Sequence, residues 1–170
     1  VNVESPPHDE DCERGALACV MLAGDAKSQQ NVESFLFQLR PNFFYDHRHR
    51  TLHTEMVRMT MEGLKLDSVT LISWLKQQKV DGQLFNKLEE SGGVAYVAKL
   101  GDGAPSFANF PYYLPKLKEF ALRRWCIATT SRLGELAKAT ELSPDKLREE
   151  FAEVYERSAN IGVTTAPLIQ

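Results

Sequence analysis

The chain has 170 residues, 43% hydrophobic and 25% charged, a composition typical of a folded protein with a sizeable core. Its net charge of -3 argues against a broad surface for polyanions, so any nucleic-acid contact has to be local. Three cysteines without C-x-x-C spacing argue against a disulfide framework or zinc ribbon, and neither a signal peptide nor a membrane-spanning run is evident. We therefore expect a soluble, cytoplasmic protein.

The first half of the chain shows helical periodicity of its apolar residues. One helix is predicted over 9–23, and a second over 31–39, with Asn31 as its cap and Pro41 as its stop. A third is predicted to end at Gly63. The stripe that this third helix turns inward is His49, Leu52, Met56 and Met59.

A fourth helix is predicted within "LDSVTLISWLKQQ", with Asp67 or Ser68 as its cap. Its inward residues are expected to be Val69, Ile72 and Leu75. A turn at Asp81-Gly82 and a short helix around Leu84, Phe85 and Leu88 should follow. No alternating β-branched run indicates a strand, so the predicted class is all-α.

The stretch "SGGVAYVAKLGDGAPSFANF" is predicted to interrupt the helices before the longest helical segment of the chain. Gly92 and Gly93 should end one short helix and admit another over 94–100, and a break follows over 101–105. Ser106 or Asn109 is the expected cap of what comes next. The stretch carries no arrangement of acid, base and nucleophile, which indicates a connection rather than an active site.

From Tyr112 to about Thr140 the periodicity is continuously helical, although Pro115 should kink or delay the start. Ser143-Pro144 begins a second helix, so the two form an antiparallel hairpin. The first arm carries two apolar stripes, which is more apolar surface than one partner helix covers and suggests contact with another chain, although packing on the rest of the molecule remains an alternative. The predicted contact residues are Leu117, Phe120, Ala121, Arg124, Trp125, Ala128, Leu147, Phe151 and Tyr155.

The two predicted arms differ in charge. The first arm has six basic residues (Lys116, Lys118, Arg123, Arg124, Arg132, Lys138) against two acidic ones (Glu119, Glu135). The second has six acidic residues (Glu141, Asp145, Glu149, Glu150, Glu153, Glu156) against three basic ones (Lys146, Arg148, Arg157). The arms are therefore electrostatically complementary.

Several motifs in a fixed order resemble the N-terminal domain of DnaB-type replicative helicases. They are "FFYDHRHRTLHTEM", "EGLKLDSVTL", "SGGVAYVAKL" and "APSFAN", followed by tyrosines and a long basic helix. In that family the domain is a helical head with a helical hairpin. It pairs through its hairpins, forms a collar above an ATPase ring and receives the primase. Pro111 and Pro115 depart from the family pattern, in which this helix usually runs uninterrupted.

The resemblance implies an N-terminal arm at 1–8, a helical head at 9–104, a hairpin at 105–159 and the start of a linker at 160–170. The implied partners are a second copy, as a dimer or as a hexamer built from three dimers, the C-terminal domain of a primase, and a helicase loader. DNA would be reached only through the full-length ring. No catalytic, cofactor or metal residues are expected in this chain.

The 170 residues hold no G-x-x-x-x-G-K-[ST] motif, which binds the phosphates of a nucleotide. We expect ATP and Mg²⁺ only in a missing ATPase domain of a parent helicase. The alternative is a free-standing helical adaptor, such as a helicase loader or inhibitor.

Three other interpretations of individual residues stay open. His49 and His53 are spaced to share a helix face as metal ligands, but a core histidine is the ordinary explanation of His49. The basic arm is also compatible with nucleic-acid binding, although a solvated face or ion pairs explain its charges at least as well. Cys12 and Cys19 fit buried structural thiols better than nucleophiles.

Overall fold

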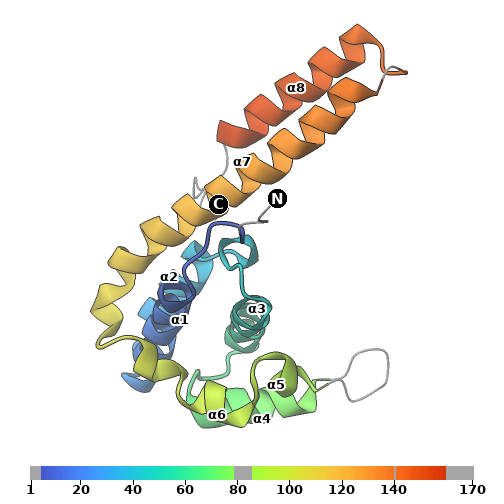
Figure 1. The fold of residues 1–170 in the computed structure, drawn as a ribbon. Helices are drawn as coiled ribbons and strands as arrows, with labels where there is room; N and C mark the ends of the chain where they lie inside the picture. The colour runs from blue at the N-terminus through green and yellow to red at the C-terminus, as the bar shows by residue number, and fades with distance from the viewer. Residues whose placement is uncertain (1–4, 79–85, 140, 160–170) are drawn as a thin grey trace. The chain divides into compact units, whose positions relative to one another are not determined.

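A computed structural model describes residues 5–78, 86–139 and 141–159 of the chain. These residues form helices and connecting turns, which confirms the predicted all-α class (Figure 1). They divide into two compact parts: a head part, His8–Leu117, and a hairpin part, which comprises the residues before His8 and after Leu117. Helix α7 (Phe110–Lys138) contributes residues to both.

The head part is built around α1 (Glu10–Asp25), one of whose faces is fully enclosed. Asp9 caps this helix, since its carboxylate accepts a hydrogen bond from the Cys12 amide at 2.9 Å, and acidic residues follow in the first turn. Gly15 permits a close approach, because a Cβ there would lie 2.6 Å from the Tyr113 ring. The buried residues of α1 include the predicted Ala16, Leu17, Val20 and Met21.

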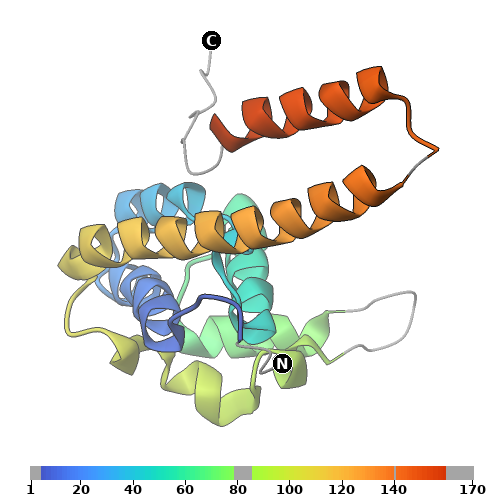
Figure 2. The same ribbon diagram turned by 45° about the horizontal axis from the view of Figure 1, so that its top comes forward.

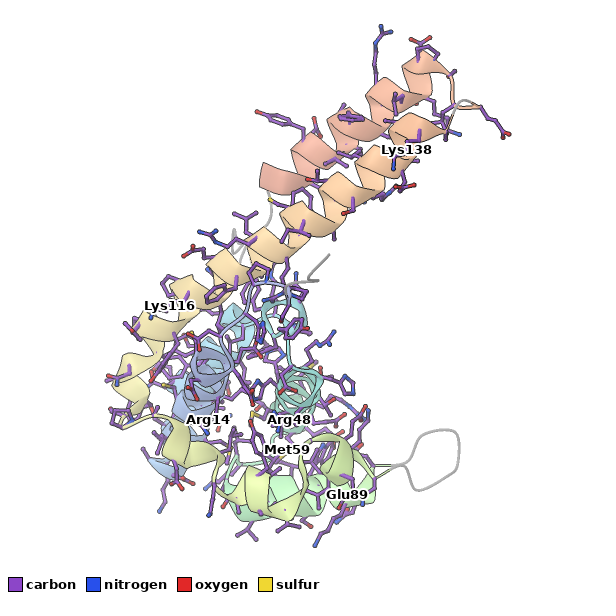
Figure 3. All side chains as sticks on the ribbon, in the orientation of Figure 1. Arg14, Arg48, Met59, Glu89, Lys116 and Lys138 are labelled. Carbon is purple, nitrogen blue, oxygen red and sulfur yellow. The ribbon has the colours of Figure 1, made fainter. Side chains whose placement is uncertain are left out.

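Helices α2 (Gln29–Gln38) and α3 (His47–Met61) complete the first half of the head part. The predicted inward stripe of α3 is confirmed, since all four of its residues are buried, and Figure 3 labels Met59 among them. Asn31 is not the cap of α2. The helix begins earlier, at Ser28, whose carbonyl accepts hydrogen bonds from the amides of Asn31 and Val32.

The next two helices are α4 (Ser68–Gln77) and α5 (Lys87–Glu90). Asp67 caps α4 as predicted, accepting a hydrogen bond from the Thr70 amide at 2.8 Å. The inward position of Val69 was predicted wrongly, because its side chain is 76% exposed while Leu71 and Leu75 are buried. The predicted turn at Asp81-Gly82 and the residues Leu84 and Phe85 lie outside the described residues; Leu88 lies in α5 and is buried.

The glycine-rich connection forms α6 (Gly93–Ala98), followed by the 3-10 turns η2 (Leu100–Gly103) and η3 (Phe107–Asn109). Gly92 has a φ of 97°, a left-handed conformation that favours glycine. Ser106 caps η3, since its hydroxyl accepts a hydrogen bond from the Ala108 amide at 3.2 Å.

Helix α7 begins at Phe110 and includes Pro115, so the expected delay at this proline was wrong. Pro111 lies in the first turn, where amides have no partner within the helix. Pro115 lies one turn further on and has no amide hydrogen to donate, so it removes one internal hydrogen bond. The helix nevertheless continues through it. The ring of Phe110 stacks on that of Phe35, with 4.0 Å between centroids, and joins the start of α7 to α2.

A buried polar cluster joins α1, α3 and α6 inside the head part. The carboxylate of Glu13 accepts hydrogen bonds from the amides of Tyr45 at 2.6 Å and Asp46 at 3.1 Å. It also lies 2.8 Å from His49 Nδ1, and His49 Nε2 lies 2.6 Å from the Tyr96 hydroxyl. Because the buried carboxylate and both imidazole nitrogens have partners, His49 is the satisfied core histidine that its stripe indicates.

Candidate partner interface on the helical hairpin

The hairpin part consists of α7 from Lys118 onward, α8 (Pro144–Ala159), and a short amino-terminal segment. Figures 1 and 2 show the two helices side by side and antiparallel, as predicted. Arg132 and Glu150 join them through an ion pair of 3.0 Å. Ser143 begins α8 by accepting a hydrogen bond from the Lys146 amide at 3.3 Å, and Pro144 occupies its first turn.

An apolar groove lies between α7 and α8 and encloses about 290 Å³. Its aromatic wall is exposed, since Phe151 is 47% and Tyr155 79% accessible to solvent. The residues that line this α7–α8 groove are Trp125, Cys126, Thr129, Thr130, Leu133, Phe151, Val154 and Tyr155. Large apolar side chains left in solvent around a concave surface are typical of a protein-binding site.

A second hollow, of about 420 Å³, lies on another side of α7 and includes the amino-terminal segment. Leu122 and Ile127 expose 39% and 53% of their surface there. The residues that line this amino-terminal hollow are Pro7, Glu119, Leu122, Arg123, Cys126 and Ile127. Cys126 lines both hollows, so they adjoin at this residue of α7, and we call the two together the apolar band.

The nine predicted contact residues separate into three groups in the structure. Leu117 and Ala121 are buried within the chain and do not contribute to its surface. Half-buried side chains belong to Phe120, Arg124, Trp125 and Leu147, and exposed ones to Ala128, Phe151 and Tyr155. The α7–α8 groove brings together Trp125, Phe151 and Tyr155.

Some residues of the apolar band were not among the predicted contacts. Cys126 and Leu122 lie beside the predicted stripes. Only the positions of α8 and of Pro7 beside α7 show that these two residues border hollows. Pro7 lies far from the hairpin in sequence, and no sequence signal indicated it. Its carbonyl accepts a hydrogen bond from Arg124 Nη1 at 2.9 Å.

The charges of the hairpin are partly paired within each arm. Arg123 pairs with Glu119 and Lys138 with Glu135 along α7, and Arg148 pairs with Asp145 along α8. These pairs are exposed to solvent, where each contributes at most about 1 kcal/mol. Figure 3 shows Lys138 near the end of α7 that leads to α8. The sequence of α7 still carries a basic surplus and that of α8 an acidic surplus.

The two cysteines of the head part are poorly reactive. Burial raises the pKa of the Cys19 thiol to about 11, and burial together with Asp9 raises that of Cys12 to about 12. Both side chains are buried, as predicted. Among the described residues, no group of three or more His, Cys, Asp or Glu side chains is placed to hold a metal ion, and no helix is long and apolar enough to cross a membrane.

Comparison with known proteins assigns the family. The family model described as DnaB-like helicase N terminal domain matches residues 5–119, most of the chain. The chain belongs to this family. The DnaB replicative helicase of Haemophilus influenzae is 27% identical over 164 residues, which cover 93% of this chain and 32% of that protein. The DnaB helicase of Treponema pallidum is 32% identical over 119 residues, covering 70% of this chain and 24% of that protein.

Solved structures of DnaB proteins have the same fold. The crystal structure of the N-terminal domain of DnaB helicase from Mycobacterium tuberculosis is 26% identical, has a TM-score of 0.72, and covers 89% of this chain and 99% of that one. A DnaB-like replicative helicase, whose structure is described together with its interactions with primase, is 16% identical with a TM-score of 0.63. The match covers 93% of this chain and 32% of that one. Because the identity is only 16%, this second likeness concerns the fold alone. The chain spans about a quarter to a third of the length of these curated DnaB relatives.

Proposed function

We propose that this domain is the non-catalytic collar part of a replicative helicase, and that its hairpin pairs subunits and receives a primase. The observation that carries the proposal is the apolar band across α7, formed by the α7–α8 groove and the amino-terminal hollow. Membership of the DnaB family supports the helicase context. The relatives are called replicative DNA helicases, and one related structure is described with primase interactions.

Self-association is the first part of the proposal. Buried aromatic anchors contribute most to protein interfaces, so an anchor in the groove should contribute about 2 kcal/mol to pairing. The test measures the molar mass of the chain, of Trp125→Ala, of Phe120→Ala and of Phe151→Ala by light scattering over a concentration series. Phe37→Ala is the matched control, because Phe37 is also an exposed phenylalanine, 64% accessible, but lies on α2 in the head part.

The expected result is weaker association for at least one of the hairpin variants and an unchanged mass for Phe37→Ala. Folded hairpin variants that all keep the parental mass at low micromolar concentration would show that the hairpin is not the contact.

Primase recruitment is the second part. The tethering contact should be reversible, with an interface of moderate size and polar character. Calorimetric titration of the C-terminal domain of the cognate primase into this chain tests it directly. Absence of heat and of a complex, with a folded and self-associating chain, would leave pairing as the supported role.

ATP hydrolysis and DNA unwinding are assigned in this proposal to a part of the full protein outside this chain. The chain by itself should neither bind nor hydrolyse ATP, because it lacks the phosphate-binding loop. ATP turnover by a preparation free of full-length helicase would contradict this assignment.

A further inference from the structure

The amino-terminal segment, residues 5–7, belongs to the hairpin part although the head part follows it directly in sequence. The chain enters the head at His8, and the cap of α1 at Asp9 comes immediately afterwards. A segment with no role beyond leading into α1 needs no contact with a helix more than a hundred residues later. Here, however, Arg124 on α7 donates a hydrogen bond to the Pro7 carbonyl.

This hydrogen bond fixes one wall of the apolar band. Pro7 lines the amino-terminal hollow together with the exposed side chains of Leu122 and Ile127. A proline with its carbonyl held by a guanidinium presents its ring as a rigid apolar surface, because the ring restricts the backbone. Without the segment, the hollow would lose this wall and α7 would offer a convex face.

Two features of the hairpin part favour a second copy of this chain as the occupant of its surface. The hairpin part carries both a hollow and protruding aromatic side chains, of which Tyr155 is the most exposed. Basic residues are also in excess along α7 and acidic residues along α8. A surface with both shapes and both charges can be matched by a two-fold copy of itself, which pairs each feature with its complement. The occupant favoured by these observations is therefore a second copy of this chain.

We propose that residues 5–7, held on α7 by Arg124, form an integral wall of the surface through which two copies of this chain pair. In this arrangement Arg124 is a positioning residue, since it acts through the segment. The inference rests on the proposed pairing function and adds to it an element outside the two helices.

The test compares dimer dissociation constants, measured by sedimentation equilibrium, for the parent chain, a variant lacking residues 1–7, and Arg124→Ala. Each change should weaken pairing by about tenfold, the size of a lost interface contact. Arg124→Lys keeps the charge and can still donate one hydrogen bond, so it should recover part of the affinity. Lys138→Ala is the matched control, because it removes the same charge from α7 outside both hollows.

Combining the deletion of residues 1–7 with Arg124→Ala shows whether Arg124 positions the segment or contacts the second copy directly. If Arg124 acts through the segment, Arg124→Ala should have no further effect in the variant that lacks residues 1–7. Circular dichroism and thermal unfolding show that each variant is folded. Additive effects of the two changes would mean that Arg124 contacts the second copy itself, and would overturn the positioning role.

The outcomes also separate this inference from the proposed function. A parent chain that pairs, with affinity unchanged by the deletion and by Arg124→Ala, would overturn the inference and leave pairing through the hairpin in place. A parent chain that remains monomeric at high micromolar concentration would overturn the pairing function itself.

Discussion

At the scale of single residues, the three cysteines differ in environment. Cys12 and Cys19 are buried in α1, and each Sγ lies within hydrogen-bonding range of a backbone carbonyl, that of Tyr113 at 3.6 Å and that of Ser106 at 3.5 Å. Cys126 is exposed on α7. The sequence indicated buried thiols for the first two from their apolar neighbours, whereas nothing in it indicated that Cys126 borders two hollows.

We predict selective labelling of Cys126 by a thiol reagent at pH 8. The thiolate is the reactive form, and the raised pKa of Cys12, about 12, and of Cys19, about 11, leaves both protonated at this pH. Mass spectrometry of the native chain should show one label, and the denatured chain should take three. Two or more labels on the native chain at early times would contradict the burial of α1.

His53 should make stability depend on pH. Burial lowers the pKa of this imidazole below its ordinary value of 6.5, and within the described residues its Nδ1 has no hydrogen-bond partner. Nε2 lies 3.2 Å from the Leu36 carbonyl, which places the neutral ring's proton on Nε2. The folded state therefore binds the added proton less readily than the unfolded state does.

The free energy of unfolding should consequently fall as the pH drops below 6.5, until the folded pKa is reached, and should be unaffected by His53 above that range. Urea denaturation between pH 5 and pH 8 measures the slope for the parent and for His53→Leu. The variant should be less stable overall but show a shallower slope. An identical slope would assign the acid sensitivity to other groups.

At the scale of elements, the period of apolar residues predicted the helices well but not every boundary. Ser28 and Asn31 are both good capping residues, and sequence alone does not distinguish which carbonyl receives the first helical hydrogen bonds. In α4 the buried pair Leu71 and Leu75 sets the inward face, and Val69 lies about 200° around the helix from Leu71. The hairpin was predictable from its caps and stripes. The hollows were not, because they depend on tertiary packing.

Substitution by alanine at two glycines should change the stability of the protein in opposite directions. At Gly24, in α1, an added Cβ would lie 2.0 Å from the carbonyl oxygen of Leu66. The two atoms would overlap, so the backbone at Leu66 or at α1 would have to shift. At Gly134, in α7, it would meet nothing within 4 Å. Gly24→Ala should therefore cost roughly 1–3 kcal/mol, as overpacking does. Gly134→Ala should stabilise the helix by about 0.5–1 kcal/mol.

Thermal and urea unfolding of the two alanine variants measures these changes. Unfolding of the head part and of the hairpin part needs separate probes if the two transitions do not coincide. An unchanged stability for Gly24→Ala would mean that α1 and the Leu66 backbone are less closely packed than the structure shows.

At the scale of the whole molecule, the separated charges of the hairpin arms should make pairing depend on salt. Opposite charges steer association over distances that salt screens, with a Debye length of about 10 Å at 0.1 M. The association rate of the chain, measured by stopped flow after dilution jumps, should fall as sodium chloride rises from about 0.05 M to 0.5 M. Rates that are independent of salt would retain pairing through the apolar band and reject the electrostatic steering.

The return of the amino-terminal segment to α7 has a practical consequence for handling the protein. Because residues 5–7 belong to the hairpin part, a purification tag fused directly before Val1 of this 170-residue chain is close in sequence to the surface proposed for pairing. Such a tag would compete sterically with a second copy and make the protein look more monomeric than it is. Assays of assembly are best made on chains whose tag has been cleaved, or placed at the other terminus.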